Sequence, residues 1–295
     1  MYAALFGNGA IAVTKFVAAA MTGSSAMLAE GVHSVADTGN QALMLLGMWR
    51  GDKPPDRTHP FGYGKEVFFW GFVVAIVLFA VGAGVSIYEG VTHLFHPAEL
   101  KDPLPNYVVL GIAAAFETVA TTIAVREFLR RKGDRGVVET LKESKDPALF
   151  VVLFEDSAAL AGIAVAAAGV FLSSATGDPV WDASASIVIG LILATVSLWL
   201  AWETRGLLVG EAARTPLLEG VRRIVATHEA VERVGKLLTM HMGPEKVLVV
   251  LSVDFASDVS AEAVESAAGE LERTIRSEHP KVGWVFLEGE SLERR

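Results

Sequence analysis

Six stretches of this chain are long and mostly apolar, and they constrain its fold more than any other feature. A lipid bilayer core requires about 20 largely apolar residues per helix. The stretches are 3–22, 24–49, 67–94, 105–131, 147–174 and 180–204. The segments 67–88, 157–177 and 183–202 contain no Asp, Glu, Lys or Arg. Buried helices of a large soluble protein would need polar faces, which these segments lack. The chain is therefore predicted to be an α-helical membrane protein with six transmembrane helices.

Basic residues predict the orientation of these helices, because cytoplasmic loops carry an excess of Lys and Arg. The connection 50–66 contains four such residues and the connection 126–146 contains seven, among them Lys142 and Lys145. The alternate connections, 22–24, 95–104 and 175–181, contain Lys101 alone. The basic connections are therefore expected in the cytoplasm, and with six spans both termini lie there too.

The end of the chain differs in composition from the rest. Overall, 52% of the 295 residues are hydrophobic and 20% are charged, which is too apolar for an ordinary soluble domain. Residues 205–295, however, show normal charged patterning. They predict a helix over 205–228, two strands joined at Gly243-Pro244, a helix over 260–278 and a final strand in VGWVFLEGE. We expect a membrane domain, 1–204, and a cytoplasmic α-β-β-α-β domain, 205–295, with an antiparallel or mixed sheet covered by helices on one face.

Charge and cysteine content limit the partners. The net charge of −9 argues against nucleic acid, which requires a basic face. The chain has no cysteine, so a metal ion would have to be held by His, Asp, Glu or backbone oxygen.

Ionisable residues inside the predicted spans mark a functional site, because they are costly there. The second span contains Glu30, His33, Asp37, Asn40 and Gln41, the fifth Glu155 and Asp156, the fourth Glu117 and the first Lys15. His33 and Asp37 are four residues apart, so one helix face presents both, and together they could bind one ion. Asp156 would supply a third ligand. Alternatively, His33 and Asp37 only hydrogen-bond each other. Lys15 either snorkels or pairs with an intramembrane carboxylate.

Three motifs resemble those of the cation diffusion facilitators: SSAMLAEGVHSVADTGNQ, HPFGYGKE (59–66) and VVLFEDSAALAG in the fifth span. Residues 146–162 look most like the branch of eukaryotic zinc transporter nine and its bacterial relatives. The resemblance implies a tetrahedral metal site that includes His33, Asp37 and Asp156. The fourth family position falls on Val152, which cannot bind a metal, so Glu155, Glu117 or water remain as candidates. The resemblance also implies a ferredoxin-like tail that forms a homodimer.

Together these features predict a proton-coupled antiporter in a bacterial inner membrane, surrounded by lipid, that exports a divalent transition metal. Zinc is the expected substrate, with iron, manganese or cobalt as alternatives, and no resident cofactor is expected. A membrane metal sensor or scaffold that binds without transport is the alternative function. An intramembrane metalloenzyme is disfavoured because no HExxH motif is present. The loop 59–65 is expected to be a defined turn, with metal capture as the other interpretation.

Overall fold

The computed structural model describes residues 2–97, 102–132, 136 and 147–290. For 2–7, 131–132 and 147–152 it describes the backbone alone. The chain divides into two compact units. The first comprises Met1–Trp49 and Phe69–Arg205, and the second comprises Arg50–Phe68 and Gly206–Arg295. The basic positions Lys101, Arg135, Lys142 and Lys145 lie outside the described residues.

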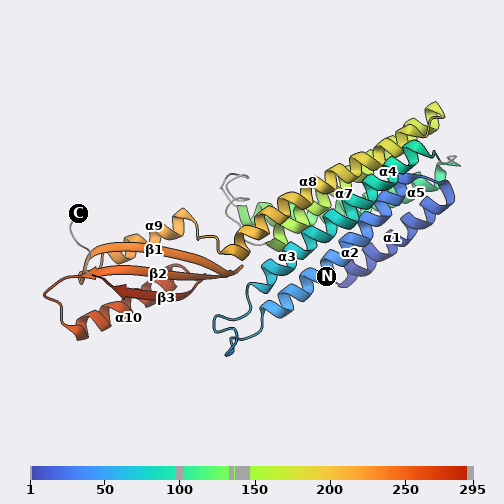
Figure 1. The fold of residues 1–295 in the computed structure, drawn as a ribbon. Coiled ribbons are helices and arrows are strands. Elements are labelled where there is room, and N and C mark those ends of the chain that lie inside the picture. The colour runs from blue at the N-terminus through green and yellow to red at the C-terminus, as the bar shows by residue number, and fades with distance from the viewer. Residues whose placement is uncertain (1, 98–101, 133–135, 137–146, 291–295) are drawn as a thin grey trace. The chain divides into compact units, whose positions relative to one another are not determined.

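Long helices that run side by side build the first unit (Figure 1). They are α1 (Tyr2–Thr22), α2 (Ser25–Gly51), α3 (Glu66–Val77) continued by η1 (Leu78–Ala83) and α4 (Gly84–Phe95), α5 (Leu104–Lys132), α7 (Pro147–Thr176) and α8 (Val180–Val209). All six predicted segments are thus helical. Within the described residues, four helices are long and apolar enough to cross a membrane: 66–95, 104–130, 153–176 and 180–209. Neither α1 nor α2 is among these four, and α2 carries the polar residues noted above, so six spans remain a prediction.

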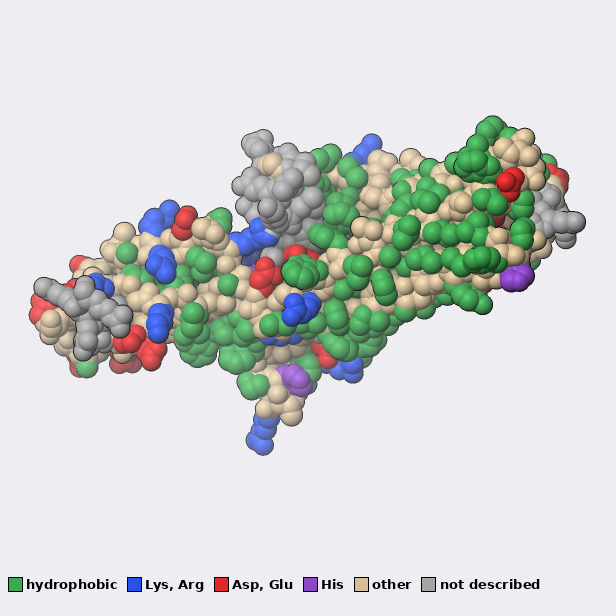
Figure 2. All heavy atoms as spheres, turned by 45° about the horizontal axis from the view of Figure 1, so that its top comes forward, with side chains coloured by type: hydrophobic (Ala, Val, Ile, Leu, Met, Phe, Trp, Pro, Cys, Tyr) green, Lys and Arg blue, Asp and Glu red, His purple; other side chains and the backbone are tan. Residues whose placement is uncertain are grey.

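The surface of the long helices is apolar. Figure 2 shows hydrophobic side chains gathered along them on the face in view. Large apolar side chains are half exposed or more on several helices, including Val17, Ile76, Phe116 and Leu198. Exposed apolar surface of this extent marks an interaction site on a soluble protein and is the ordinary surface of a protein in lipid.

Small residues allow helices α4 and α8 to approach closely. A Cβ added to Gly190 would lie 2.5 Å from Ile87 Cγ1 and 3.0 Å from the carbonyl oxygen of Ala83. Reciprocally, a Cβ on Gly90 would lie 2.8 Å from the carbonyl oxygen of Ala183. Helices in lipid lack a hydrophobic drive to associate, so backbone contact of this kind stabilises their packing.

Asp182 joins the start of α2 to the start of α8. Its Oδ1 accepts a hydrogen bond from the Ser24 hydroxyl at 2.6 Å, and its Oδ2 accepts from the backbone N–H of Ser25 at 2.6 Å. The first N–H groups of a helix have no partner within the helix and favour a negative charge. A buried carboxylate from α8 therefore satisfies the N-terminus of α2.

The sequence did not predict the π-helical turn η1 inside the third span. Here the Ser86 hydroxyl donates to the Gly82 carbonyl oxygen at 2.6 Å. The Gly84 N–H donates to the Phe79 carbonyl oxygen, five residues earlier, which is the hydrogen-bond pattern of a π turn.

The second unit contains α9 (Thr215–Ala226), β1 (Val231–Gly243), β2 (Lys246–Phe255), α10 (Ala261–Glu278) and β3 (Val282–Gly289). This is the predicted α-β-β-α-β order. The prediction of one helix over 205–228 is wrong, because α8 ends at Val209 and α9 begins at Thr215. Gly210 has φ +114°, which breaks the helix. Pro216 then lies in the first turn of α9, where its missing N–H costs nothing.

The three strands form a mixed sheet in the order β1-β2-β3, with β1 antiparallel and β3 parallel to β2. Alternate residues of β2, from Val247 to Val253, are buried. They pack in one core with Val221 and Val225 of α9 and with Leu271 and Ile275 of α10. Because successive side chains point to opposite faces of a strand, both helices must cover the same face.

The loop between α2 and α3 belongs to this second unit. Phe61 packs edge-on against Trp284, with ring centroids 5.5 Å apart, on the sheet face opposite the helices. Within the loop, Asp56 Oδ1 accepts from the backbone N–H groups of Thr58 and His59 at 2.8 Å each, and Asp56 Oδ2 accepts from the Tyr63 hydroxyl at 2.7 Å. These bonds make the defined turn that the sequence predicted.

Candidate metal site

A buried polar face of α2 is the core of the candidate site. Glu30, His33, Asp37 and Asn40 follow one another at intervals of three, four and three residues, which places them on one side of a helix. Each is at most 5% exposed. Burial of four such groups is costly unless each is paired or binds an ion.

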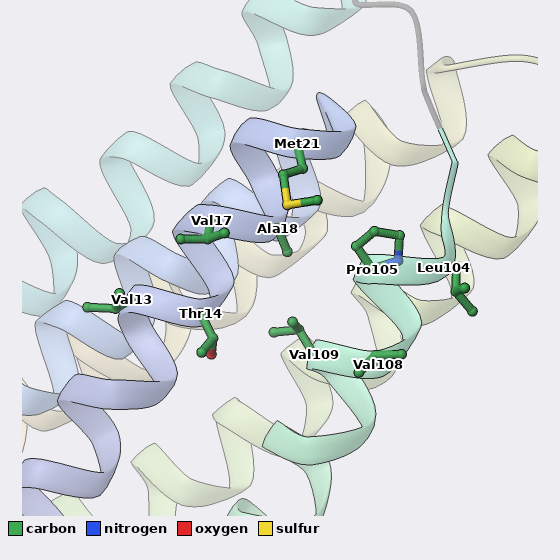
Figure 3. Close-up of a pocket in the computed structure, with 9 residues that line it drawn as sticks. All are labelled: Val13, Thr14, Val17, Ala18, Met21, Leu104, Pro105, Val108 and Val109. Atoms are coloured by element: carbon green, nitrogen blue, oxygen red, sulfur yellow. The ribbon is translucent and has the colours of Figure 1, made fainter.

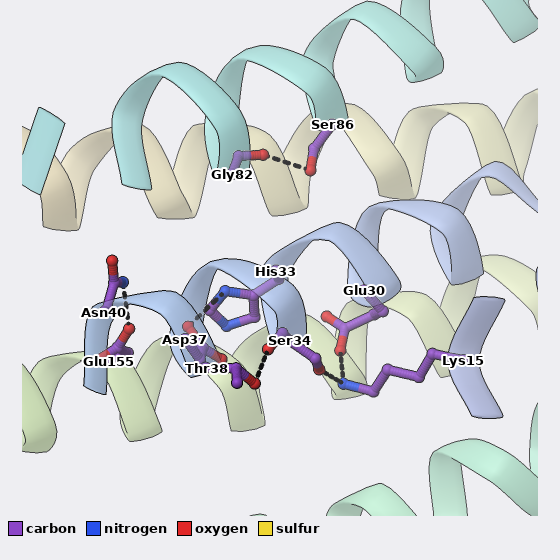
Figure 4. A network of polar contacts seen from close by, with 10 residues as sticks. All are labelled: Lys15, Glu30, His33, Ser34, Asp37, Thr38, Asn40, Gly82, Ser86 and Glu155. Carbon is purple, nitrogen blue, oxygen red and sulfur yellow. Dashed lines mark hydrogen bonds and ion pairs between the residues drawn. The ribbon is translucent and has the colours of Figure 1, made fainter. Parts of the chain in front are cut away.

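His33 and Asp37 face each other along this helix (Figure 4). His33 Nδ1 lies 3.2 Å from Asp37 Oδ1, which is an ion-pair distance, but the two atoms are not aligned for a hydrogen bond. Within the described part of the chain, neither ring nitrogen of His33 has a hydrogen-bond partner, and Asp37 Oδ1 has none. Buried polar atoms are rarely left unpaired. The pair therefore has unused capacity to coordinate a cation.

Helix α7 brings Glu155 to the same place. Asn40 Nδ2 donates to Glu155 Oε1 at 2.6 Å, and the Glu155 and Asp37 carboxyl groups interact directly. Glu155 is 5% exposed. Of the two adjacent acids of α7, Glu155 is thus the one in contact with the polar face of α2. The sequence offered it only as a candidate fourth ligand, and it did not indicate the contact with Asn40.

Asp156 and Glu117 lie nearby and interact electrostatically with each other and with Glu155. Glu117 is 8% exposed, and Asp156 is partly buried. Among the residues that the structure describes, no three His, Asp or Glu side chains converge closely enough to hold a metal ion. The structure therefore places His33 with Asp37, and Asp37 with Glu155, as pairs. The side chain of Val152 lies outside the described residues.

Lys15 of α1 pairs with a carboxylate and does not snorkel, which decides between the two alternatives left by the sequence. Its Nζ lies 2.8 Å from Glu30 Oε2 and 2.8 Å from Ser34 Oγ, and the side chain is fully buried. Figure 4 shows this network beside His33.

A groove of about 410 Å³ between α1 and α5 offers no comparable chemistry. It is lined by Val13, Thr14, Val17, Ala18, Met21, Leu104, Pro105, Val108 and Val109 (Figure 3). Its single hydroxyl, on Thr14, already donates to the Ile11 carbonyl oxygen at 2.8 Å. The groove has no group suited to binding a cation.

The family assignment rests on the helical unit. The model of the cation efflux transmembrane domain matches residues 1–209, which include the whole candidate site. This chain belongs to the cation efflux family, the cation diffusion facilitators. The resemblance found in the three motifs is confirmed.

Three relatives illustrate the range of the family. The chain is 31% identical over 250 residues to the human proton-coupled zinc antiporter SLC30A9, mitochondrial, covering 84% of this chain and 44% of that protein. It is 30% identical to metal tolerance protein C4 of Arabidopsis thaliana, over 95% of this chain and 60% of that protein. It is 24% identical to the manganese efflux system protein MneP of Bacillus subtilis, over 90% and 86%. The chain therefore spans less than half the length of its human relative.

Proposed function

We propose that this cation efflux family member is an antiporter that exports a divalent transition-metal ion, with zinc as the first candidate, from the cytoplasm in exchange for protons. The observation that carries the proposal is the buried His33–Asp37 pair, whose ring nitrogens and Asp37 Oδ1 have no hydrogen-bond partner in the described chain. The family membership and the names of the zinc and manganese relatives support it.

The donor set favours zinc over the alkaline-earth ions. Zinc takes nitrogen and oxygen ligands with four-coordinate geometry, whereas magnesium and calcium prefer oxygen alone. We assign His33, Asp37 and Asp156 as ligands, as the family resemblance implies, and Glu155 as the fourth, ahead of Glu117. Manganese, iron and cobalt remain candidates, because one imidazole among carboxylates discriminates weakly.

Competition between protons and metal for the same groups would produce exchange. Metal binding requires a neutral imidazole and ionised carboxylates, so a bound ion displaces protons. Imidazole in water titrates near pH 6.5, which lies in the range that cells use. When the site opens outward, protons displace the metal, and when it opens inward, the metal displaces the protons. No separate proton path is needed.

The proposal includes six spans, cytoplasmic termini and a homodimer. The tail sheet presents an apolar face opposite its helices, where Leu238, Val250 and Phe286 lie in register on three strands. Phe61 packs on part of this face, against Trp284 and Phe286, yet Leu238 is 62% exposed and Phe286 is 48% exposed. A second copy could cover such a face. We expect light scattering of the purified chain to give the mass of a dimer without added zinc.

Zinc flux into vesicles of reconstituted full-length protein tests the proposed function. Uptake should rise when the lumen is acidic and collapse when a protonophore is added. His33→Ala should abolish it, whereas the matched variant His96→Ala, at an exposed histidine beyond α4, should transport as wild type. Zinc binding without flux would identify a sensor or scaffold, and flux that ignores the proton gradient from about pH 6 to 8 would exclude antiport.

A further inference from the structure

Lys15 is a buried cation that the proposed ligand set does not use. It is one of the largest fully buried side chains of the molecule, and its ammonium group donates to both Glu30 and Ser34. A charged lysine deep in a membrane helix is expensive, and such residues usually serve ion pathways. Neutral groups could provide a purely structural contact between α1 and α2. The hydrogen bond between Thr22 and Asn106 is such a contact between α1 and α5.

The position of this ammonium group is fixed from two sides. Glu30 holds it through Oε2, while Glu30 Oε1 lies against Gly162 of α7, where an added Cβ would collide with that oxygen. Ser34 holds it from the next turn of α2. Three helices thus determine where the positive charge lies.

The ammonium group of Lys15 acts on the candidate ligands. Ser34 directly follows His33 in α2, and Lys15 acts electrostatically on His33 and on Asp37. Lys15 also acts on Glu117, and there Glu30 opposes it. Figure 4 shows the Lys15 side chain reaching from α1 to Glu30 and Ser34, with His33 and Asp37 farther along α2.

We propose that Lys15 is a resident cation that weakens the binding of a divalent metal at the His33–Asp37 site, so that the metal can leave. This inference rests on the proposed function, because it concerns the affinity of the same site. A carrier must bind its ion tightly enough to load it and weakly enough to release it. A fixed positive charge opposes a bound divalent ion, and in a protein interior this opposition is far stronger than in water.

Two substitutions with opposite expected effects test the role of the charge. Glu30→Gln preserves an oxygen acceptor for Lys15 but removes the neighbouring negative charge, so the unopposed ammonium should weaken zinc binding roughly tenfold. The double variant Lys15→Met/Glu30→Gln removes both charges and should bind zinc roughly tenfold more tightly than wild type. A structural role would instead weaken binding, or leave it unchanged, in both variants.

The readouts are the zinc Kd of the purified full-length chain, measured by titration calorimetry with zinc chloride at fixed pH, and the KM and kcat of vesicle uptake. In the double variant, Kd and KM should fall, and kcat should fall as well because release becomes slow. Thr22→Val is the matched control, since it removes a buried hydrogen bond of the same helix, to Asn106, without changing the charge. Its Kd should equal that of wild type.

The outcomes separate this inference from the proposed function. Opposite shifts in Kd support the role of Lys15 even if wild-type protein carries no zinc across the membrane, in which case only transport is refuted. If the wild-type protein transports zinc and the Kd of the double variant is equal to or higher than that of wild type, the inference is overturned. Transport is then unaffected by that result. If the double variant does not fold, an unchanged Kd in Glu30→Gln alone overturns it.

Discussion

At Glu155, one substitution separates the role of charge from the role of shape. Glu155→Gln keeps an oxygen that can accept the Asn40 hydrogen bond of 2.6 Å, but it removes the negative charge beside Asp37. We therefore expect normal protein yield. Zinc uptake should be reduced at least roughly tenfold, because the metal loses a charged group from its surroundings. Initial rates of uptake in vesicles, normalised to protein, provide the measurement.

Glu117→Gln is the comparison for this experiment, because Glu117 interacts electrostatically with Glu155 and Asp156 and was the other candidate for the fourth ligand. Its uptake should fall less than that of Glu155→Gln. If both variants transport at the wild-type rate, water or backbone oxygen must complete the ligand shell. A larger loss in Glu117→Gln would exchange the two assignments.

Sequence spacing alone was sufficient to place His33 and Asp37 on one face of α2, because a helix fixes the angle between residues four apart. It could not pair Asn40 with Glu155 or Lys15 with Glu30. Those contacts depend on how α1, α2 and α7 are rotated about their axes, and the rotation is set by packing along their whole length. For Lys15, snorkelling and pairing were equally compatible with the residue's position.

Among the helices, the contact between α4 and α8 depends on the absence of one methyl group. Gly190→Ala would place a Cβ 3.0 Å from the Ala83 carbonyl oxygen, which is backbone and cannot rotate away. We expect a cost of about 1–3 kcal/mol, as for other overpacked contacts. The expected observation is a lower midpoint of thermal unfolding in detergent.

Gly111→Ala in α5 is the matched control, because nothing lies within 4 Å of a Cβ added there. Alanine stabilises a helix more than glycine does, so the midpoint of thermal unfolding should stay the same or rise slightly. Equal losses in the two variants would mean that the α4–α8 contact contributes nothing specific.

The turn between α2 and α3 should respond to acid through Asp56. Hydrogen bonds from Tyr63 and Thr58, and from the backbone of His59, hold the pKa of the Asp56 carboxyl well below its ordinary value. A lowered folded-state pKa stabilises the turn fully above about pH 4, and the contribution is lost as the pH falls below that value. The protection factors of the Thr58 and His59 amides, which are the intrinsic exchange rate divided by the observed rate at each pH, should accordingly fall in acid.

Asp56→Asn should show these lowered protection factors already at neutral pH, since the charge is absent throughout. The Asp56 carboxylate also raises the pKa of the Tyr63 phenol by accepting its hydrogen bond. In Asp56→Asn, spectroscopic titration of tyrosine should therefore reveal one phenol that ionises at lower pH than in wild type. An unaltered tyrosine titration would contradict the role of this bond.

The helices and strands that follow from a local sequence pattern were predicted. Long apolar runs gave all six helices, and alternation gave the strands. The break at Gly210 was missed although the sequence carries a stop signal, a glycine followed by Pro216. The positive φ of this glycine shows that the helix ends there. The π turn at 78–83 was missed because its residues are as apolar as those around it, so no pattern distinguishes the two hydrogen-bond registers.

For the whole molecule, the sequence predicts more spans than the apolarity of the described helices alone identifies. Charge asymmetry between loops favours six spans, while length and apolarity within the described residues identify four helices. One reason for the difference is α2, whose polar face lowers its apolarity although that face is buried within the protein. Ionisable residues of transmembrane helices almost always face the interior of the bundle, so a polar face of this kind is compatible with a span.

Single cysteines can decide the topology directly, because the chain contains none of its own. With six spans, Met21→Cys and Ala175→Cys should react with a membrane-impermeant maleimide in intact cells. Arg57→Cys, in the basic loop, should react only after permeabilisation. If α1 and α2 did not cross, Met21 and Arg57 would lie on the same side and would label alike. Labelling of Arg57→Cys in intact cells would reverse the orientation and, with it, the direction of export.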